Sequence, residues 1–219
     1  QPMLADEKVR YVGEPMAVVI AESPAIAEDA LDLIKIQIDS LPAITSRDQA
    51  EAVETLLFPE HGSNVSMRWN AVKGDADVAF ETADYTRRET FTVQRHAALF
   101  MEPRGFVAEW DTGAERLTVW GAAKVAFANR KILAATMGLD LDQIDMIESD
   151  VGGSFGSRGE FYPEDFLIPF AARYLGRPIK WVEDRCEHMM AANHARQIEC
   201  DVAIAATRDG KIIALRGTN

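Results

Sequence analysis

The residues of this sequence that are best suited to chemistry lie in a glycine-rich stretch, residues 150–160, with the sequence DVGGSFGSRGE. Gly152, Gly153 and Gly156 carry no Cβ, so the backbone there can come close to a ligand. A predicted helix follows, and a helix start offers unpaired N–H groups and a partial positive charge. These groups suit an oxo, phosphate or other anionic group. The alternative is a purely structural turn between a strand and a helix.

This stretch matches neither common nucleotide-binding pattern, because no Lys-Ser/Thr follows a Gly-x4-Gly and the spacing is not GxGxxG. Two cysteines, Cys186 and Cys200, and four scattered histidines lack the spacing of metal ligands, so no protein-ligated metal is predicted. We expect both cysteines to be reduced and buried, as in a cytoplasmic protein.

The charge balance disfavours binding to nucleic acids or to anionic membranes. The chain of 219 residues has 23 Lys and Arg against 35 Asp and Glu, a net charge of -12, whereas phosphate binding relies on clustered basic charge. No apolar run reaches the length of a membrane span, and residues 1–8 lack the order of a secretory signal. A hydrophobic fraction of 47% is enough to form a core.

Periodicity and turn signals predict the elements that hold the glycine-rich stretch. A strand over residues 144–148 precedes it, and a helix over 160–175, ended by Gly176, follows it. A second helix covers residues 124–137 and ends at Gly138. Further strands are predicted over residues 85–93, 104–110, 116–120, 178–182, 197–206 and 211–215.

The N-terminal residues predict a β-α-β unit. Residues 16–21 (MAVVIA) are typical of a buried strand, and Ser23-Pro24 of a helix start. Ile36 and Ile38 alternate with polar residues up to Leu41-Pro42, which predicts a second strand. A helix over about residues 48–57 follows. Residues 58–68 are rich in Pro, Gly, Ser and Asn and predict a linker. The mixture of elements predicts an α+β (mixed α/β) fold.

The motif Gly-Gly-x-Phe-Gly between a strand and a helix resembles a cofactor-holding loop. It occurs in the large, molybdenum-cofactor-binding subunit of the xanthine dehydrogenase / aldehyde oxidase / carbon monoxide dehydrogenase family. Other segments resemble that family in the same order: VRYVGEPMAVVIAES at 9–23, MEPRG at 101–105, VWG at 119–121, GRPIKWVEDR at 176–185 and DGKI at 209–212. The resemblance covers the whole chain. It implies an α/β hammerhead domain over residues 1–60, a linker with a short helix over 61–84, and part of the first molybdenum-cofactor-binding domain over 85–219.

The resemblance also implies a set of cofactor-binding residues: Gly152, Gly153, Ser154, Phe155, Gly156, Lys124 and Arg158. Lys124 stands where many members have a glutamine that hydrogen-bonds the cofactor; it either reaches the anionic pterin or phosphate or is a solvated first-turn residue. Arg158 either pairs with a cofactor phosphate or lies at the surface. Gly159 stands where purine-oxidising members carry a glutamate, so the chain resembles carbon monoxide dehydrogenase-like large subunits more closely. The general base and the cysteine-bearing loop of the family would lie beyond Asn219, so no catalytic residue is expected here.

In the whole protein, the resemblance implies a molybdenum-molybdopterin cofactor in the cytosine dinucleotide form. The enzyme would oxidise carbon monoxide, an aldehyde or an N-heterocycle, with water as the oxygen source. Electrons would leave through an iron–sulfur subunit and an FAD subunit of a heterotrimer that dimerises. The alternative is a non-catalytic docking module for those partner subunits. We expect the 219 residues to be an internal fragment that is inactive and free of cofactor by itself.

Overall fold

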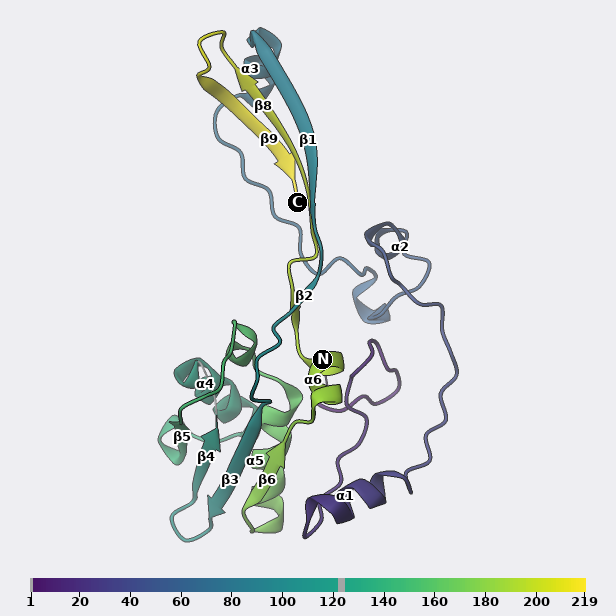
Figure 1. Cartoon of the computed structure of the whole chain (residues 1–219), viewed down its shortest axis with the longest axis vertical. Coiled ribbons are helices and arrows are strands. Elements are labelled where there is room, and N and C mark those ends of the chain that lie inside the picture. Colours follow the sequence, from purple (N-terminus) through teal and green to yellow (C-terminus); the bar gives the residue numbers. More distant parts are fainter. Residues whose placement is uncertain (1, 122–124) are drawn as a thin grey trace. The chain divides into compact units, whose positions relative to one another are not determined.

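Strands β3 (Gly105–Asp111), β4 (Arg116–Gly121), β5 (Ile144–Glu148) and β6 (Ile179–Val182) form a sheet in the order β5-β4-β3-β6 (Figure 1). The computed structural model describes residues 2–121 and 125–219. The chain divides into two units. The first contains residues 1–17, 91–200 and 219, including this sheet, and the second contains residues 18–90 and 201–218.

Two helices cover the sheet of the first unit. Helix α4 (Ala126–Met137) packs on β5, and helix α5 (Pro163–Leu175) packs on β3 and β6. Apolar residues alternate with polar ones along the strands, so each strand turns its apolar side to the helices. The shared core consists of Phe106, Ala108, Leu117, Val119, Leu133, Ala134, Ile144, Ile168 and Ala172.

Both helices end at the predicted glycines. Gly138 after α4 and Gly176 after α5 have φ values of 63° and 61°, in the left-handed region where a residue without Cβ is favoured. Helix α5 begins at Pro163, three residues later than predicted, because residues 157–159 form a separate 3-10 helix (Ser157–Gly159). The two predicted helices are confirmed within the described residues.

Shorter elements complete the first unit: β2 (His96–Ala97) pairs with β7 (His194–Ala195), a 3-10 helix covers Leu141–Gln143, and α6 covers Arg185–Ala191. Helix α6 was not predicted. Its start is a capping box, in which Asp184 and Glu187 each accept a backbone hydrogen bond from the other. The expectation that both cysteines are buried is wrong, because Cys186 in this short helix is exposed and Cys200 is half-buried.

Strands β1 (Tyr85–Val93), β8 (Ile198–Ala206) and β9 (Ile212–Thr218) form a three-stranded sheet in the order β1-β8-β9. Most of its residues belong to the second unit. Strands β8 and β9 form an antiparallel hairpin whose turn contains Gly210 at φ 87°. Helix α3 (Ala76–Thr82) packs against β9. The strands predicted in this region are confirmed, and β9 extends to Thr218.

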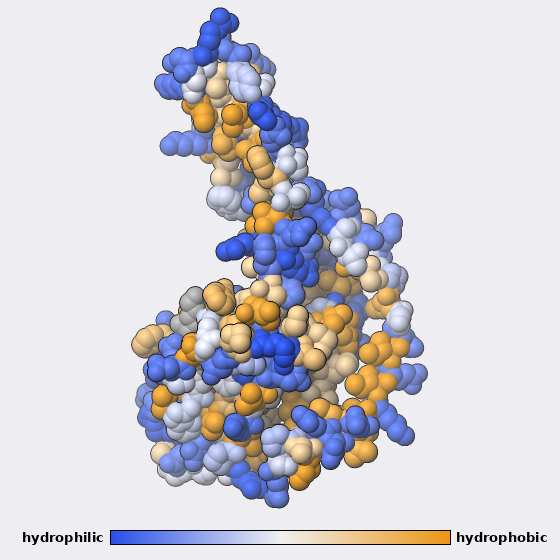
Figure 2. All heavy atoms as spheres, viewed as in Figure 1, coloured by the Kyte–Doolittle hydropathy of each residue, from blue (hydrophilic) through white to orange (hydrophobic). Residues whose placement is uncertain are grey.

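The N-terminal β-α-β prediction is correct only for its helix. Helix α1 (Pro24–Leu31) starts as predicted, with the Ser23 hydroxyl accepting from the N–H of Ile26 at 3.3 Å. Residues 16–21 and 36–38 form no strand, because no described strand pairs with them and an unpaired strand lacks its ladder of hydrogen bonds. Their apolar side chains stay at the surface, with Val18 41% and Ile36 53% exposed; Figure 2 shows apolar side chains on the surface of the chain.

The remaining elements of this region are short. Helix α2 covers only Arg47–Glu51, less than the predicted 48–57, and a 3-10 helix covers Pro59–His61. None of the helices among the described residues combines the length and the apolar character needed to cross a bilayer.

Candidate cofactor-binding site

The glycine-rich loop lies between the end of β5 and the start of α5. Gly153 and Gly156 have φ values of 107° and 99°, and Phe155, which also has a positive φ of 48°, is 81% exposed. At Gly152, a Cβ would lie 2.6 Å from the Cβ of Glu102, so no side chain fits there. The predicted turn is therefore present. Gly152 allows the close approach of Glu102, and Gly153 and Gly156 adopt positive φ angles that residues with a Cβ rarely adopt.

The carbonyl groups of the loop are held by the protein. The carbonyl of Gly152 accepts from the N–H of Glu102 at 3.4 Å, and that of Gly153 accepts from Nε of Arg158 at 2.7 Å. The carbonyl of Ser154 accepts from the N–H of Ser157 at 3.1 Å. In a planar trans peptide the C=O and the following N–H point in opposite directions. The N–H groups of Gly153, Ser154 and Phe155 therefore point away from the groups that hold the carbonyls.

Those N–H groups have no acceptor in the part of the chain that the structure describes. Within residues 2–121 and 125–219, nothing accepts a hydrogen bond from the N–H of Gly153, Ser154, Phe155 or Gly156. The hydroxyl of Ser154 is buried and also lacks a partner there. In general, successive backbone N–H groups in a turn with left-handed residues can bind an anion.

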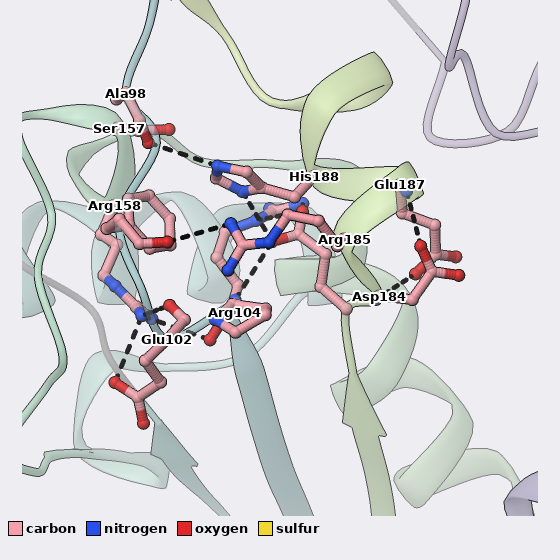
Figure 3. A network of polar contacts seen from close by, with 12 residues as sticks. Ala98, Glu102, Arg104, Ser157, Arg158, Asp184, Arg185, Glu187 and His188 are labelled. Atoms are coloured by element: carbon pink, nitrogen blue, oxygen red, sulfur yellow. Dashed lines mark hydrogen bonds and ion pairs between the residues drawn. The ribbon is translucent and has the colours of Figure 1, made fainter.

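Arg158 lies beneath the loop and is 3% exposed. Its guanidinium donates to the carbonyls of Gly153, Glu102 and Pro103, and lies 4.4 Å from the centre of the Phe100 ring. Figure 3 shows Arg158 beside Glu102. Burial lowers the pKa of Arg158, opposed by the charge of Glu102. The surface alternative for Arg158 is wrong, because the side chain is buried against backbone carbonyls.

Glu102 is the carboxylate beside the loop. Its Oε2 accepts from the N–H of Gly152 at 2.5 Å and lies 3.3 Å from Nη2 of Arg158. Sequence reasoning singled out the segment MEPRG but did not assign this role, and it placed no carboxylate near the loop. The contact joins residues 50 positions apart, so only the tertiary structure reveals it.

A buried ionic cluster stands next to Arg158. Arg104 donates to Glu183 Oε1 at 3.0 Å from Nε and 2.6 Å from Nη2, and Glu183 Oε2 lies 3.0 Å from Nδ1 of His188. Burial alone would raise the pKa of Glu183, but hydrogen bonds and the charge of Arg104 outweigh it and hold that pKa below its usual range. Sequence reasoning included Glu183 only in the family-like segment 176–185 and gave it no partner.

The sheet brings the predicted site segments to a common edge. Strands β4 and β5 are parallel, and their last residues, Gly121 and Glu148, are paired. The loop follows β5, and Lys124 follows β4 but lies outside the described residues. Ligands of open α/β sheets bind outside the carboxyl ends of parallel strands, which is where this loop begins.

The described residues contain no group of three or more His, Cys, Asp or Glu side chains that could hold a metal ion. A cavity of about 520 Å³ lies between β4, β5 and α4, lined by Thr118, Trp120, Ala126, Phe127, Arg130, Asp145, Met146 and Ile147. The glycine-rich loop does not line it.

The fold and the loop are those of a mixed α/β cofactor-binding domain. Residues 57–219 match the molybdopterin cofactor-binding domain, and residues 1–42 match the a/b hammerhead domain of aldehyde oxidase and xanthine dehydrogenase. The chain thus belongs to the molybdopterin cofactor-binding family of the xanthine dehydrogenase and carbon monoxide dehydrogenase large subunits.

Three similar proteins illustrate the relationship. The chain is 38% identical over 98% of its length to the 6-hydroxypseudooxynicotine dehydrogenase complex subunit gamma of Paenarthrobacter nicotinovorans. It is 31% identical over 99% to the carbon monoxide dehydrogenase large chain of Afipia carboxidovorans. The structure of quinoline 2-oxidoreductase from Pseudomonas putida 86 matches 99% of the chain with a TM-score of 0.92 and 34% identity. The chain spans 27% of the first relative and 28% of the other two. The expected family and fold class are confirmed.

Proposed function

We propose that the chain is part of the large subunit of a molybdenum hydroxylase. In this proposal, Gly152, Gly153, Ser154, Phe155 and Gly156 hold the molybdopterin cofactor. The observation that carries the proposal is the row of N–H groups in this loop that find no acceptor among the described residues. The family match over residues 57–219 supports the choice of molybdopterin rather than another anion.

The loop fits a group that presents several oxygen atoms. A buried hydroxyl without a partner, such as that of Ser154, costs roughly 1–3 kcal/mol, which a ligand acceptor would recover. The neighbouring N–H groups would donate to anionic oxygens, and at Gly152 the absence of Cβ lets the backbone pack against Glu102. The guanidinium of Arg158 donates its hydrogen bonds to backbone carbonyls, so we do not propose that it binds a cofactor phosphate. Lys124 remains a proposed contact to the pterin or its phosphate.

When bound, the molybdenum of the cofactor supplies two-electron oxidation of a small substrate with water as the oxygen source. The residues of this chain bind and orient the group through fixed backbone donors, which need no reorganisation during the reaction. The carboxylate of Glu102, which contacts the loop, accepts from the N–H of Gly152 and pairs with Arg158. We therefore assign no proton-transfer role to it.

The whole protein would act on carbon monoxide, an aldehyde or an N-heterocycle. The names of two relatives, 6-hydroxypseudooxynicotine dehydrogenase and quinoline 2-oxidoreductase, refer to N-heterocycles and favour that class. We propose the cytosine dinucleotide form of the cofactor, an iron–sulfur subunit and an FAD subunit as partners in a dimerised heterotrimer, and a cytoplasmic location. The relative named as a complex subunit supports a multisubunit assembly.

A second proposal is that part of the chain is a docking module for such partner subunits. The exposed apolar side chains around α1, such as Ile20 and Leu33, favour it. The two functions are compatible within one large subunit, because the docking residues and the glycine-rich loop are different segments of the chain.

The cofactor proposal can be tested with a matched pair of glycine substitutions in the complete gene product. Gly156 and Gly138 both have positive φ and open space around a hypothetical Cβ, so alanine introduces backbone strain at either position. Only Gly156 lies in the loop. We expect Gly156→Ala to lower the molybdenum content per subunit, measured by metal analysis, and Gly138→Ala to leave it unchanged.

Equal molybdenum content in the two variants would contradict the proposal. The 219 residues expressed alone should hold no molybdenum and show no activity, because a site built from several segments loses contacts when some are missing. Near-stoichiometric molybdenum in that preparation would overturn this expectation.

A further inference from the structure

A short segment without strand partners runs beside the glycine-rich loop. We name residues 98–103 the clamped segment, because cationic side chains or His188 contact most of its carbonyls. His188 Nε2 lies 3.2 Å from the carbonyl of Ala98, and Arg185 donates to those of Phe100 and Met101 at 2.9 and 2.8 Å. Arg158 donates to the carbonyls of Glu102 and Pro103 (Figure 3).

Arg158 alone among these three side chains also contacts the loop. Its Nε donates to the carbonyl of Gly153 at 2.7 Å, while its Nη2 donates to the clamped segment. The side chain is 1% exposed, so its guanidinium is positioned to hold backbone rather than to meet a ligand in solvent.

We propose that Arg158 is a positioning residue, which orients the peptide between Gly153 and Ser154 so that the N–H of Ser154 faces the cofactor. The inference rests on the proposed function of the loop. Because the C=O and N–H of one trans peptide are antiparallel, the bond from Arg158 to the Gly153 carbonyl fixes the direction of the Ser154 N–H.

Because glycine peptides rotate freely, the orientation of the peptides in this loop must be fixed by other residues. Gly152 and Gly153 have no Cβ to restrict their backbone angles, so the peptides beside them rotate more freely than others. Glu102 fixes the N–H of Gly152, and Arg158 fixes the carbonyl of Gly153. The planar guanidinium donates to the loop and to the clamped segment at once, which the single ammonium of lysine does less well.

The test uses the complete gene product with Arg158→Ala, Arg158→Lys and a matched control, Arg185→Ala. Arg185 holds two carbonyls of the clamped segment but does not touch the loop. Side chains that orient metal ligands typically change metal affinity by roughly 10–100-fold when replaced, and we expect a similar factor for a side chain that orients a backbone donor. We expect the Arg158 variants to lose cofactor affinity by this factor and Arg185→Ala to retain it. The comparison is made between variants whose melting temperatures fall by similar amounts.

Two further readouts separate positioning from general destabilisation. Guanidinium ion at millimolar concentration should restore cofactor binding to Arg158→Ala, because it can occupy the vacated site. It should not restore binding to Gly156→Ala, whose backbone is altered. Hydrogen exchange should show faster exchange of the amides at residues 153–156 in Arg158→Ala than in Arg185→Ala.

The outcomes distinguish this inference from the proposed function. If Gly156→Ala loses the cofactor but Arg158→Ala and Arg158→Lys keep it, the loop binds the cofactor and the positioning role is wrong. Equal loss of cofactor in Arg185→Ala, without rescue by guanidinium, also overturns the positioning role. If Gly156→Ala keeps the cofactor, the proposed function fails and the inference fails with it. Arg158→Lys provides the test if Arg158→Ala does not fold.

Discussion

The carboxyl group of Asp165 makes the stability of the first unit depend on pH in a way that can be measured. Asp165 lies in the first turn of α5, is 7% exposed and accepts the N–H of Tyr162 at 2.8 Å. Burial raises the pKa of Asp165 from 3.8 to about 7. Since the folded chain binds this proton more tightly than the unfolded chain, the stabilisation is present below the unfolded pKa and is lost as the pH rises through 7.

The magnitude follows from the size of the shift. A difference of about three pH units corresponds to about 4 kcal/mol, at about 1.4 kcal/mol per unit. Asp165→Asn keeps an oxygen that can accept the N–H of Tyr162 but cannot ionise. We expect the variant to match the parent near the unfolded pKa of 3.8 and to be more stable by about 4 kcal/mol above pH 7.

Urea unfolding of the 219-residue chain from acidic to weakly alkaline pH, followed by tryptophan fluorescence, provides the assay, because Trp110 and Trp181 pack against the core of this unit. The lowered pKa of Glu183 acts in the opposite direction, with stability lost as the pH falls. It is common to both proteins and cancels in their difference. A difference in unfolding free energy that does not change with pH would refute the reasoning.

Three further predictions concern the core, the linker and Lys124. Leu133→Ala should reduce the free energy of unfolding by roughly 2–5 kcal/mol, because Leu133 is fully buried in the core; a loss below this range in urea unfolding would contradict that packing. Limited proteolysis should first cut within residues 58–68, the proposed domain boundary, and an initial cut within residues 16–38 would count against it. In the complete gene product, Lys124→Ala should weaken cofactor retention by roughly 1.5–3 kcal/mol if Lys124 donates a charged hydrogen bond, and unchanged molybdenum content and turnover would return it to the solvated alternative.

Sequence alone predicted the elements whose patterns are local. Strands β1 and β5 have the predicted bounds: β1 is rich in Thr, Tyr, Phe and Val, which favour strands, and β5 has apolar residues at alternate positions 144 and 146. Helices α4 and α5 end at glycines that adopt left-handed backbone. The predicted strand at residues 16–21 did not form, since a strand also needs a partner that its own sequence does not reveal. Helix α6 was missed because only its capping box marks it in so short a segment.

The glycine-rich loop was likewise found from sequence, but not the way its peptides are held. Glycine spacing indicates freedom of the backbone without specifying a direction. The direction of these peptides comes from their hydrogen bonds to Glu102 and Arg158. Arg158 is in turn held against the Phe100 ring, and these contacts join segments that are distant in sequence. For the same reason sequence reasoning left open whether Arg158 lies at the surface, whereas the structure places it in the interior.

The contacts that shape the loop also have a consequence for the order of folding. Glu102 meets Gly152 across 50 residues and Arg158 across 56, and His188 meets Ala98 across 90. Contacts of such separation carry a larger loop-closure cost than the local contacts within α4 or α5, and we expect them to form late. Substitutions at Glu102 should therefore accelerate unfolding while leaving the refolding rate nearly unchanged, whereas a slowed refolding phase would show that the clamped segment docks early.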